Sequence, residues 1–205
     1  MRARLFALML GLLPLTGCID ADLTLDFQDD STVETVMEIR FGRELFDLTG
    51  KSPEAMCKDG TATVGAEVVT CVQRRTSTLD DFIAEVERRA GADPAARMQQ
   101  AARVERLDGN RLRVTLDFAG LAAAGGPEVA QARQMAGLMR AALAGHSFVF
   151  RVKAPKIEAT TGTLSADGKT AERVVPLSAM VSDTPPAPFV TTLAFKSCWF
   201  GVFCF

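Results

Sequence analysis

Residues 19–41, IDADLTLDFQDDSTVETVMEIRF, predict the first structural unit of this chain. Leu23, Leu25 and Phe27 alternate with polar residues, and the apolar residues between positions 33 and 41 do the same. Successive side chains of a β-strand point to opposite faces, so this alternation is typical of strands with one buried face. Residues 28–31, Gln-Asp-Asp-Ser, separate the two runs and have the composition of a turn. The stretch therefore predicts a β-hairpin with one apolar and one polar face.

Further elements follow at short intervals along the chain. In the first half we expect short helical turns in 43–58, a strand in 61–75 with a bulge at Gly65, and a helix from the cap Thr78 to Gly91. A hairpin around 108–110, whose return strand is 111–118, and a helix over 127–143 should follow. The last part predicts a strand in 148–153, a hairpin around 166–169 and a final strand in 189–195. Many hairpins with few helices predict an α+β fold. We expect one antiparallel sheet with the two main helices packed on one face, in a single domain.

The N-terminus predicts export and a lipid anchor. A basic start with Arg2 and Arg4 precedes an apolar run from Leu5 to Leu15, and Leu15-Thr16-Gly17-Cys18 follows. The run has about 11 residues, whereas a membrane-spanning helix needs about 20, so it is typical of a cleaved signal peptide. The tetrapeptide resembles the lipobox of bacterial lipoproteins. The resemblance implies cleavage after residue 17 and a lipid of the palmitate class on Cys18, with 18–205 as the mature envelope domain.

The cysteines fit this compartment. Apart from Cys18, the chain contains four, an even number, which in an exported protein favours disulfides. Three pairings are open, and we favour the nearest-neighbour one, Cys57 with Cys71 and Cys198 with Cys204. A zinc site made by all four is disfavoured, because such sites usually contain close Cys-x2-Cys pairs.

Two segments of the mature chain resemble a known family. Cys18 is followed directly by a strand-like run, and residues 152–170 read VKAPKIEATTGTLSADGKT, in which a strand leads to a proline, a Thr-Gly step and an Asp-Gly turn. Together they resemble the LppM-type domain of bacterial envelope lipoproteins. The resemblance implies an α+β lipoprotein domain with a role in lipid or glycolipid handling or in host contact. It implies no catalytic residues.

The sequence offers little for catalysis. His146 is the single histidine, and the motifs of serine hydrolases, zinc proteases and phosphate-binding loops are missing from the sequence. The aspartates of 20–30 could bind a divalent ion, but Asp20, Asp22 and Asp26 share one strand face and are more typical of a solvated surface. We therefore expect no enzyme activity, no cofactor and no metal.

Two apolar segments are candidate binding surfaces. The predicted helix 127–143 carries Met135, Leu138, Met139 and Leu143, which would either fill the core or roof a pocket for an acyl chain. The C-terminal segment contains Trp199, Phe200 and Phe203 between Cys198 and Cys204. It is either a last strand packed into the core or a disulfide-tied aromatic knob that contacts a membrane or a partner.

Charge narrows the range of partners. The precursor has 23 basic and 25 acidic residues, and loss of residues 1–17, which hold Arg2 and Arg4, leaves a net charge of about −4. A mildly acidic chain without basic blocks is a poor candidate for nucleic-acid binding. The sequence thus predicts a non-enzymatic, lipid-anchored envelope lipoprotein acting through protein contacts, with lipid or glycolipid binding as the alternative. Ile19 after the lipobox favours the periplasmic side of the outer membrane over the inner membrane.

Overall fold

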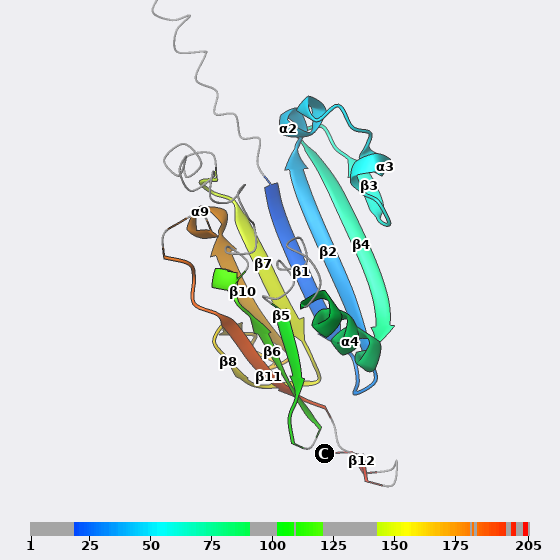
Figure 1. Ribbon diagram of the computed structural model, residues 1–205, viewed down its shortest axis with the longest axis vertical. Helices are drawn as coiled ribbons and strands as arrows, with labels where there is room; N and C mark the ends of the chain where they lie inside the picture. The colour runs from blue at the N-terminus through cyan, green and yellow to red at the C-terminus, as the bar shows by residue number, and fades with distance from the viewer. Residues whose placement is uncertain are drawn as a thin grey trace, which may run out of the picture.

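The computed structural model describes residues 19–90, 102–108, 110–120, 143–180, 182, 184–195, 198–199 and 203–204. These residues form an α+β domain made mostly of antiparallel strands, as the sequence predicts (Figure 1). Its elements are β1 (Ile19–Phe27), β2 (Thr32–Gly42), α2 (Arg43–Leu48), α3 (Pro53–Met56), β3 (Thr61–Val64), β4 (Val68–Thr78), α4 (Leu79–Ala90), β5 (Ala102–Arg106), β6 (Arg111–Leu116), β7 (Ser147–Lys153), β8 (Lys156–Thr160), β9 (Thr163–Leu164), β10 (Thr170–Pro176), α9 (Leu177–Met180), β11 (Phe189–Ala194), β12 (Cys198–Trp199) and β13 (Phe203–Cys204). The predicted signal peptide, Cys18 and most of the predicted helix 127–143 lie outside the described residues.

The predicted hairpin of residues 19–41 is confirmed as β1 and β2. The two strands pair antiparallel, with Leu23 opposite Met37 and Phe27 opposite Val33. Asp29 closes the turn, because its carboxylate accepts hydrogen bonds from the backbone N–H groups of Ser31 at 2.8 Å and Thr32 at 2.7 Å. The Ser31 hydroxyl also donates a hydrogen bond to this carboxylate. These bonds, with that of the hydroxyl as the largest cause, stabilise the charged form and lower the pKa of Asp29.

A parallel pairing joins this hairpin to the second half of the chain. β1 lies beside β7, with Ala21 level with Phe148 and Leu25 level with Val152. The result is a seven-stranded sheet in the order β3-β4-β2-β1-β7-β10-β9. The sequence predicts the strands but not this neighbour, since the partners are more than 120 residues apart.

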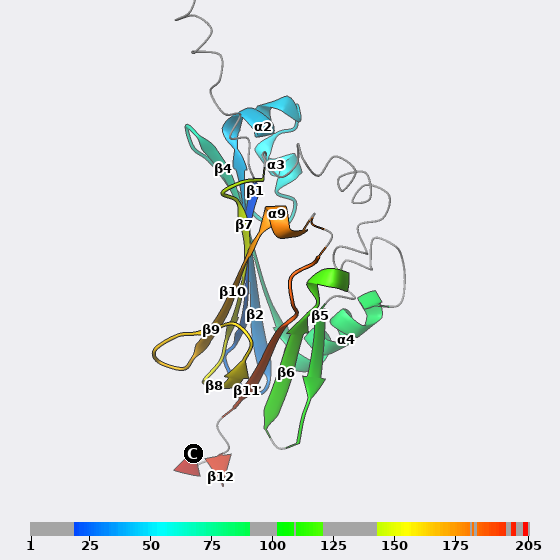
Figure 2. The ribbon, with the colours of Figure 1, turned by 90° about the vertical axis from the view of Figure 1, so that its left-hand side faces the viewer.

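The remaining long strands form a second sheet that packs on the first. Its order is β5-β6-β11-β8, and it faces the apolar side of the seven-stranded sheet (Figure 2). The chain changes sheets between β7 and β8, at Ala154-Pro155. Phe150 of β7 and Phe189 of β11 meet edge to face across the interface, with ring centroids 5.3 Å apart. One hydrophobic core therefore joins both sheets.

Helix α4 is the predicted helix that follows Thr78. The Thr78 hydroxyl accepts a hydrogen bond from the N–H of Asp81 at 3.1 Å and donates one to its carboxylate at 2.7 Å. This caps the first turn. Phe82 packs edge to face on Phe27, with centroids 6.2 Å apart, so α4 covers one side of the core.

The region predicted as one strand over 61–75 is a hairpin instead. β3 and β4 pair antiparallel, with Val64 opposite Val69, and Gly65 lies in the turn, where its N–H donates to the Val68 carbonyl at 2.9 Å. Apolar residues occupy every second position from Ala62 to Val68, straight through the turn, so this pattern does not reveal the reversal of the chain.

Helices α2 and α3 cover one end of the seven-stranded sheet. They are the short turns predicted within 43–58, and Phe46 of α2 is buried together with Val69 of β4. The segment after α3 is tied to β4 by the disulfide between Cys57 and Cys71. These buried residues do not belong to the main hydrophobic core.

Removal of this disulfide should destabilise the domain. The bond closes a loop of 14 residues, and such a loop restricts the unfolded chain enough to contribute about 3 kcal/mol. We expect the C57S/C71S variant to lose about that much free energy of unfolding, measured by denaturant titration. An unchanged unfolding midpoint would show that the crosslink contributes nothing.

Gly162 should not tolerate a side chain. A Cβ at this position would collide with the Glu172 carbonyl oxygen and lie 2.5 Å from the Phe189 ring. Overpacking of this kind costs about 1–3 kcal/mol. We expect Gly162→Ala to lower the free energy of unfolding by that amount, while Thr163→Ala at the exposed neighbouring position changes it by less than about 0.5 kcal/mol. Equal effects of the two substitutions in thermal denaturation would contradict this account.

Candidate functional site

The two sheets and α4 line a partly open cavity of about 690 Å³. Pockets for small ligands measure about 300–1,000 Å³. The cavity is therefore large enough for an apolar ligand of moderate size.

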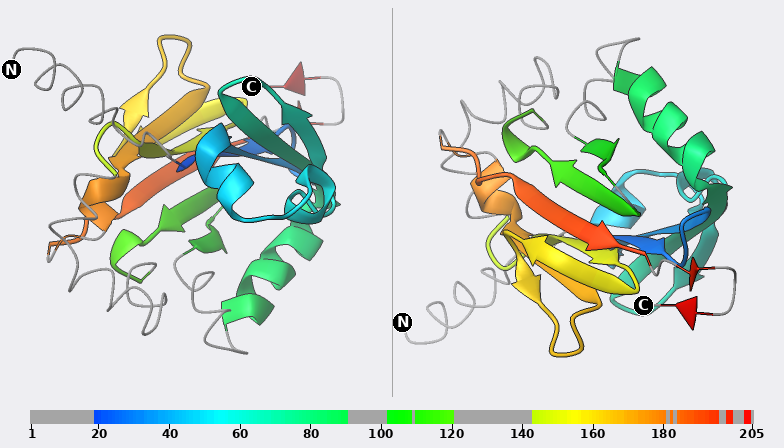
Figure 3. Two further views of the ribbon diagram at one scale, coloured as in Figure 1. Left: turned by 90° about the horizontal axis from the view of Figure 1, so that it is seen from above. Right: turned by 90° about the horizontal axis from the view of Figure 1, so that it is seen from below.

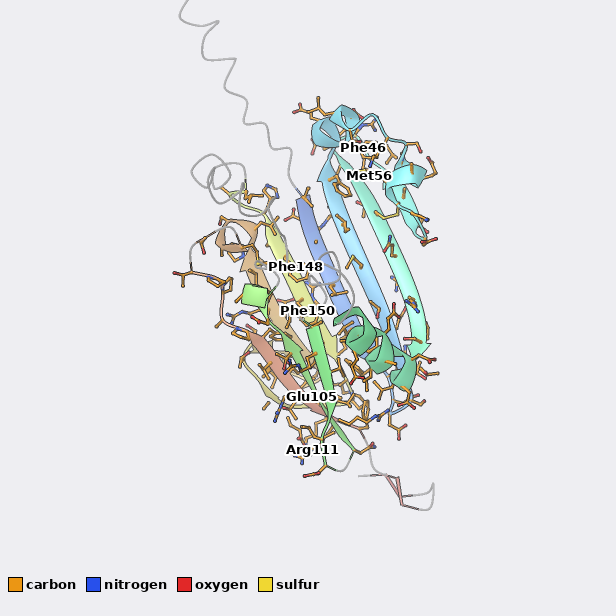
Figure 4. All side chains as sticks on the ribbon, in the orientation of Figure 1. Phe46, Met56, Glu105, Arg111, Phe148 and Phe150 are labelled. Carbon is orange, nitrogen blue, oxygen red and sulfur yellow. A yellow bond between two sulfur atoms is a disulfide. The ribbon has the colours of Figure 1, made fainter. Side chains whose placement is uncertain are left out.

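Apolar side chains of the seven-stranded sheet form the floor of the cavity. Leu23 and Leu25 come from β1, Met37 from β2 and Phe150 from β7. Phe148 and Phe150 project from the same face of β7 (Figure 4), with their rings stacked at 6.4 Å between centroids. The alternation in β1, β2 and β7 places these residues on one face, because their polar neighbours point to the opposite side.

The facing wall comes from α4 and the second sheet. Phe82 and Val86 line it from α4, and Ala102, Val104, Val114 and Leu116 line it from β5 and β6. Val104, Val114 and Leu116 are buried, but Phe82 and Ala102 are only partly buried beside the core. Apolar surface thus remains in contact with unfilled space, which is the usual state of a ligand pocket.

Polar groups stand on one side of this apolar space. Arg75 of β4 and Glu85 of α4 both line the cavity, and their side chains form an ion pair at 2.8 Å. Gln73 lines it beside them and donates a hydrogen bond to the Lys58 carbonyl at 2.8 Å. Glu85 is the more buried partner of the ion pair, with 14% of its side chain exposed against 63% for Arg75. An amphipathic ligand would meet apolar walls at one end and these charges at the other.

Of the residues predicted to roof a pocket, only Leu143 belongs to the part of the chain that the structure describes. Met135, Leu138 and Met139 lie outside the described residues. Leu143 is described and partly buried, but it does not line the cavity. Among the described residues, the helix beside the cavity is α4.

The structure contains the Cys57–Cys71 disulfide that nearest-neighbour pairing predicts. For the second pair, the backbone of β12 and β13 places Cys198 directly opposite Cys204 in an antiparallel register. Directly opposed residues have Cα atoms about 4.5–5.5 Å apart, which lies in the range for disulfides. The register is therefore compatible with the predicted bond, whose side chains are not described.

The C-terminal strand pair lies far from the start of the domain. β12 and β13 are at the opposite end of the long axis from the first residue of β1 (Figures 1 and 2). Trp199 and Phe203 belong to these strands and pair in register, whereas Phe200 lies outside the described residues.

Asp22, on the polar face of β1, is engaged by two arginines. Asp22 accepts hydrogen bonds from Arg40 at 2.6 Å and Arg151 at 2.8 Å. Burial alone would lower the pKa of Arg151, but its bonds to Asp22 and Glu172 outweigh that effect and raise it. In the described part of the chain, the structure groups no three metal-binding side chains.

The single histidine also has an acidic partner. Nδ1 of His146 lies 3.2 Å from the carboxylate of Asp20, which also accepts the backbone N–H of Ser147 at 2.8 Å. Neither residue lines the cavity. The pair therefore holds the starts of β1 and β7 together and is not placed to act on a ligand in the cavity.

Comparisons with known proteins add one finding. The NMR structure of the folded domain of LppM from Mycobacterium tuberculosis is similar to this chain, with a TM-score of 0.46 and 10% identity over 87% of this chain and 91% of that one. A likeness at this level carries no argument about activity. No protein-family model matches the chain, and no curated protein matches it. Among the described helices, none is both long and apolar enough to cross a membrane.

The cavity should take up an apolar dye. We expect 1-N-phenylnaphthylamine to gain fluorescence with the protein, because apolar walls exclude water from the dye. Ala102→Phe should weaken dye binding about tenfold, because the phenylalanine ring would occupy space in the cavity that the dye needs. Overpacking of this kind costs about 1–3 kcal/mol. Ala159→Phe is the matched control, because Ala159 is exposed on β8, the opposite edge strand of the same sheet. Equal dye binding by the two variants would show that the dye binds elsewhere.

Proposed function

We propose that this chain is an extracytoplasmic lipoprotein, tethered through a lipid on Cys18, that holds an amphipathic lipid or glycolipid in the cavity between its two sheets. The cavity carries the proposal. Its volume of about 690 Å³ suits a lipid-like ligand, and residues such as Leu25 and Phe150 make its floor apolar. The Arg75–Glu85 ion pair supplies polar contacts beside the apolar walls.

A role through protein contacts is the second candidate. The observation in its favour is the position of β12 and β13, which carry aromatic residues at the end of the molecule opposite to the start of β1 (Figure 1). A tether at Cys18 would present this end to partners away from the membrane. We place the protein on the periplasmic face of the outer membrane, in line with Ile19 after the lipobox.

Native mass spectrometry tests the proposed function. The mature chain with Cys18→Ala, purified from the periplasm, should retain adducts of lipid mass that disappear in organic solvent. Ala102→Phe should reduce the adduct fraction about tenfold, while Ala159→Phe should leave it unchanged. A bare mass for the parent and both variants would reject lipid storage in the cavity and favour the role through protein contacts.

A further inference from the structure

Exposed apolar side chains gather at one end of the molecule. In the described part of the chain, the large hydrophobic residues with the most exposed side chains are Ile19, Leu48, Val64, Val68, Leu164 and Val174. The first four share the end at which β1 starts, and Leu48 is the most exposed of all at 77%. Leu164 and Val174 belong to β9 and β10.

Strand register places Ile19, Val64 and Val68 at the same end of the seven-stranded sheet. Ile19 is level with Phe41, Phe41 is level with Val69, and Val69 is level with Val64 on the next strand. Val68 pairs with Gly42, the residue before α2, and α2 carries Leu48. Seen from above, α2 lies at this end beside the start of β1 (Figure 3). We call Ile19, Leu48, Val64 and Val68 the apolar end.

The anchor lies beside the apolar end with no linker between them. β1 begins at Ile19, and Cys18 is the preceding residue. Consecutive Cα atoms are 3.8 Å apart, so a lipid inserted from Cys18 holds the start of β1 at the bilayer surface. The exposed apolar residues around it then meet the headgroup region, where burial of apolar side chains is favourable.

Charge indicates what kind of contact this is. Residues 40–68, which include α2, α3 and the β3–β4 turn, contain four basic and five acidic residues. A polybasic surface that depends on anionic lipids is therefore not present here. The contact at the apolar end would depend on apolar burial and resist salt.

We propose that the apolar end docks on the bilayer that holds the lipidated Cys18, with Leu48 and Val64 in the headgroup region. This inference rests on the lipid anchor of the proposed function, but not on the cavity. The seven-stranded sheet would then stand away from the membrane, with β12 and β13 at the distal end.

Site-specific lipid quenching tests the docking. The full lipidated chain is reconstituted in vesicles of phosphatidylethanolamine and phosphatidylglycerol that contain a nitroxide-labelled lipid. A fluorescent amino acid is introduced at one position at a time, which leaves the Cys57–Cys71 disulfide intact. Leu48 and Val64 are the test positions. Leu164 is the control of matched exposure, at 46% against 48% for Val64, and Asp30 reports the turn at the other end of β1.

We expect a loss of fluorescence at Leu48 and Val64 and none at Leu164 and Asp30. The pattern should persist in about 1 M salt, where charges are screened beyond about 3 Å. Equal quenching at all four positions, quenching at none, or loss of the signal in salt would overturn the proposed docking. Crosslinking of positions 48 and 64 to another protein in native membranes, together with an absence of lipid quenching at these positions, would also overturn it.

The test separates docking from anchoring. Mass spectrometry of the reconstituted chain reports whether Cys18 carries lipid. An unmodified Cys18 rejects the proposed anchor, and the same four positions are then measured in the chain tethered by an N-terminal histidine tag to nickel-chelating lipids. Selective quenching at Leu48 and Val64 in that state still supports docking, and its absence rejects it.

Discussion

The parallel pairing of β1 with β7 is the interaction on which the rest of the structure depends. It joins two groups of antiparallel strands into one seven-stranded sheet, and so creates the continuous apolar face that the second sheet covers. Polar contacts between β1 and β7 reinforce this pairing, both at the starts of the two strands and on the face of the sheet that points away from the core. Asp20 accepts the backbone N–H of Ser147, and Asp22 pairs with Arg151. Both aspartates lie on the polar face of β1, so the same alternation that provides apolar residues for the core also provides the charges that align the two strands.

The cavity follows from how the two sheets meet. The chain changes sheets at Ala154-Pro155, and β11 of the second sheet approaches β7, where Phe150 packs on Phe189. Gly162 permits the same close approach beside Glu172. On the other side of the core, α4 stands between β4 and β5, and Phe82 and Ala102 leave space unfilled. The sheets thus pack tightly on one side of the core and are separated by a helix on the other, which leaves a cavity large enough for a ligand.

The two ends of the domain differ in a way that suits a tethered protein. One end carries the start of β1, the short helices and exposed apolar residues, and the Cys57–Cys71 bond ties the segment after α3 to β4. The opposite end carries β12 and β13 (Figure 1). A lipid at Cys18 would therefore set which end faces the bilayer, because no linker separates the anchor from the first strand.

The sequence by itself determined the local structure of this protein. Alternation and turn residues placed the hairpin of 19–41, Thr78 and Asp81 placed the start of α4, and cysteine spacing predicted the Cys57–Cys71 bond. These features join residues that are near one another in the chain, so local alternation, turn residues and cap residues are enough to specify them. The pairing of β1 with β7, the division into two sheets and the cavity were decided by the tertiary structure. Each of these features depends on which apolar faces meet and on how completely their side chains fill the space between them. The sequence does not specify them, because alternation along one strand shows which face is apolar but not which strand or sheet it meets.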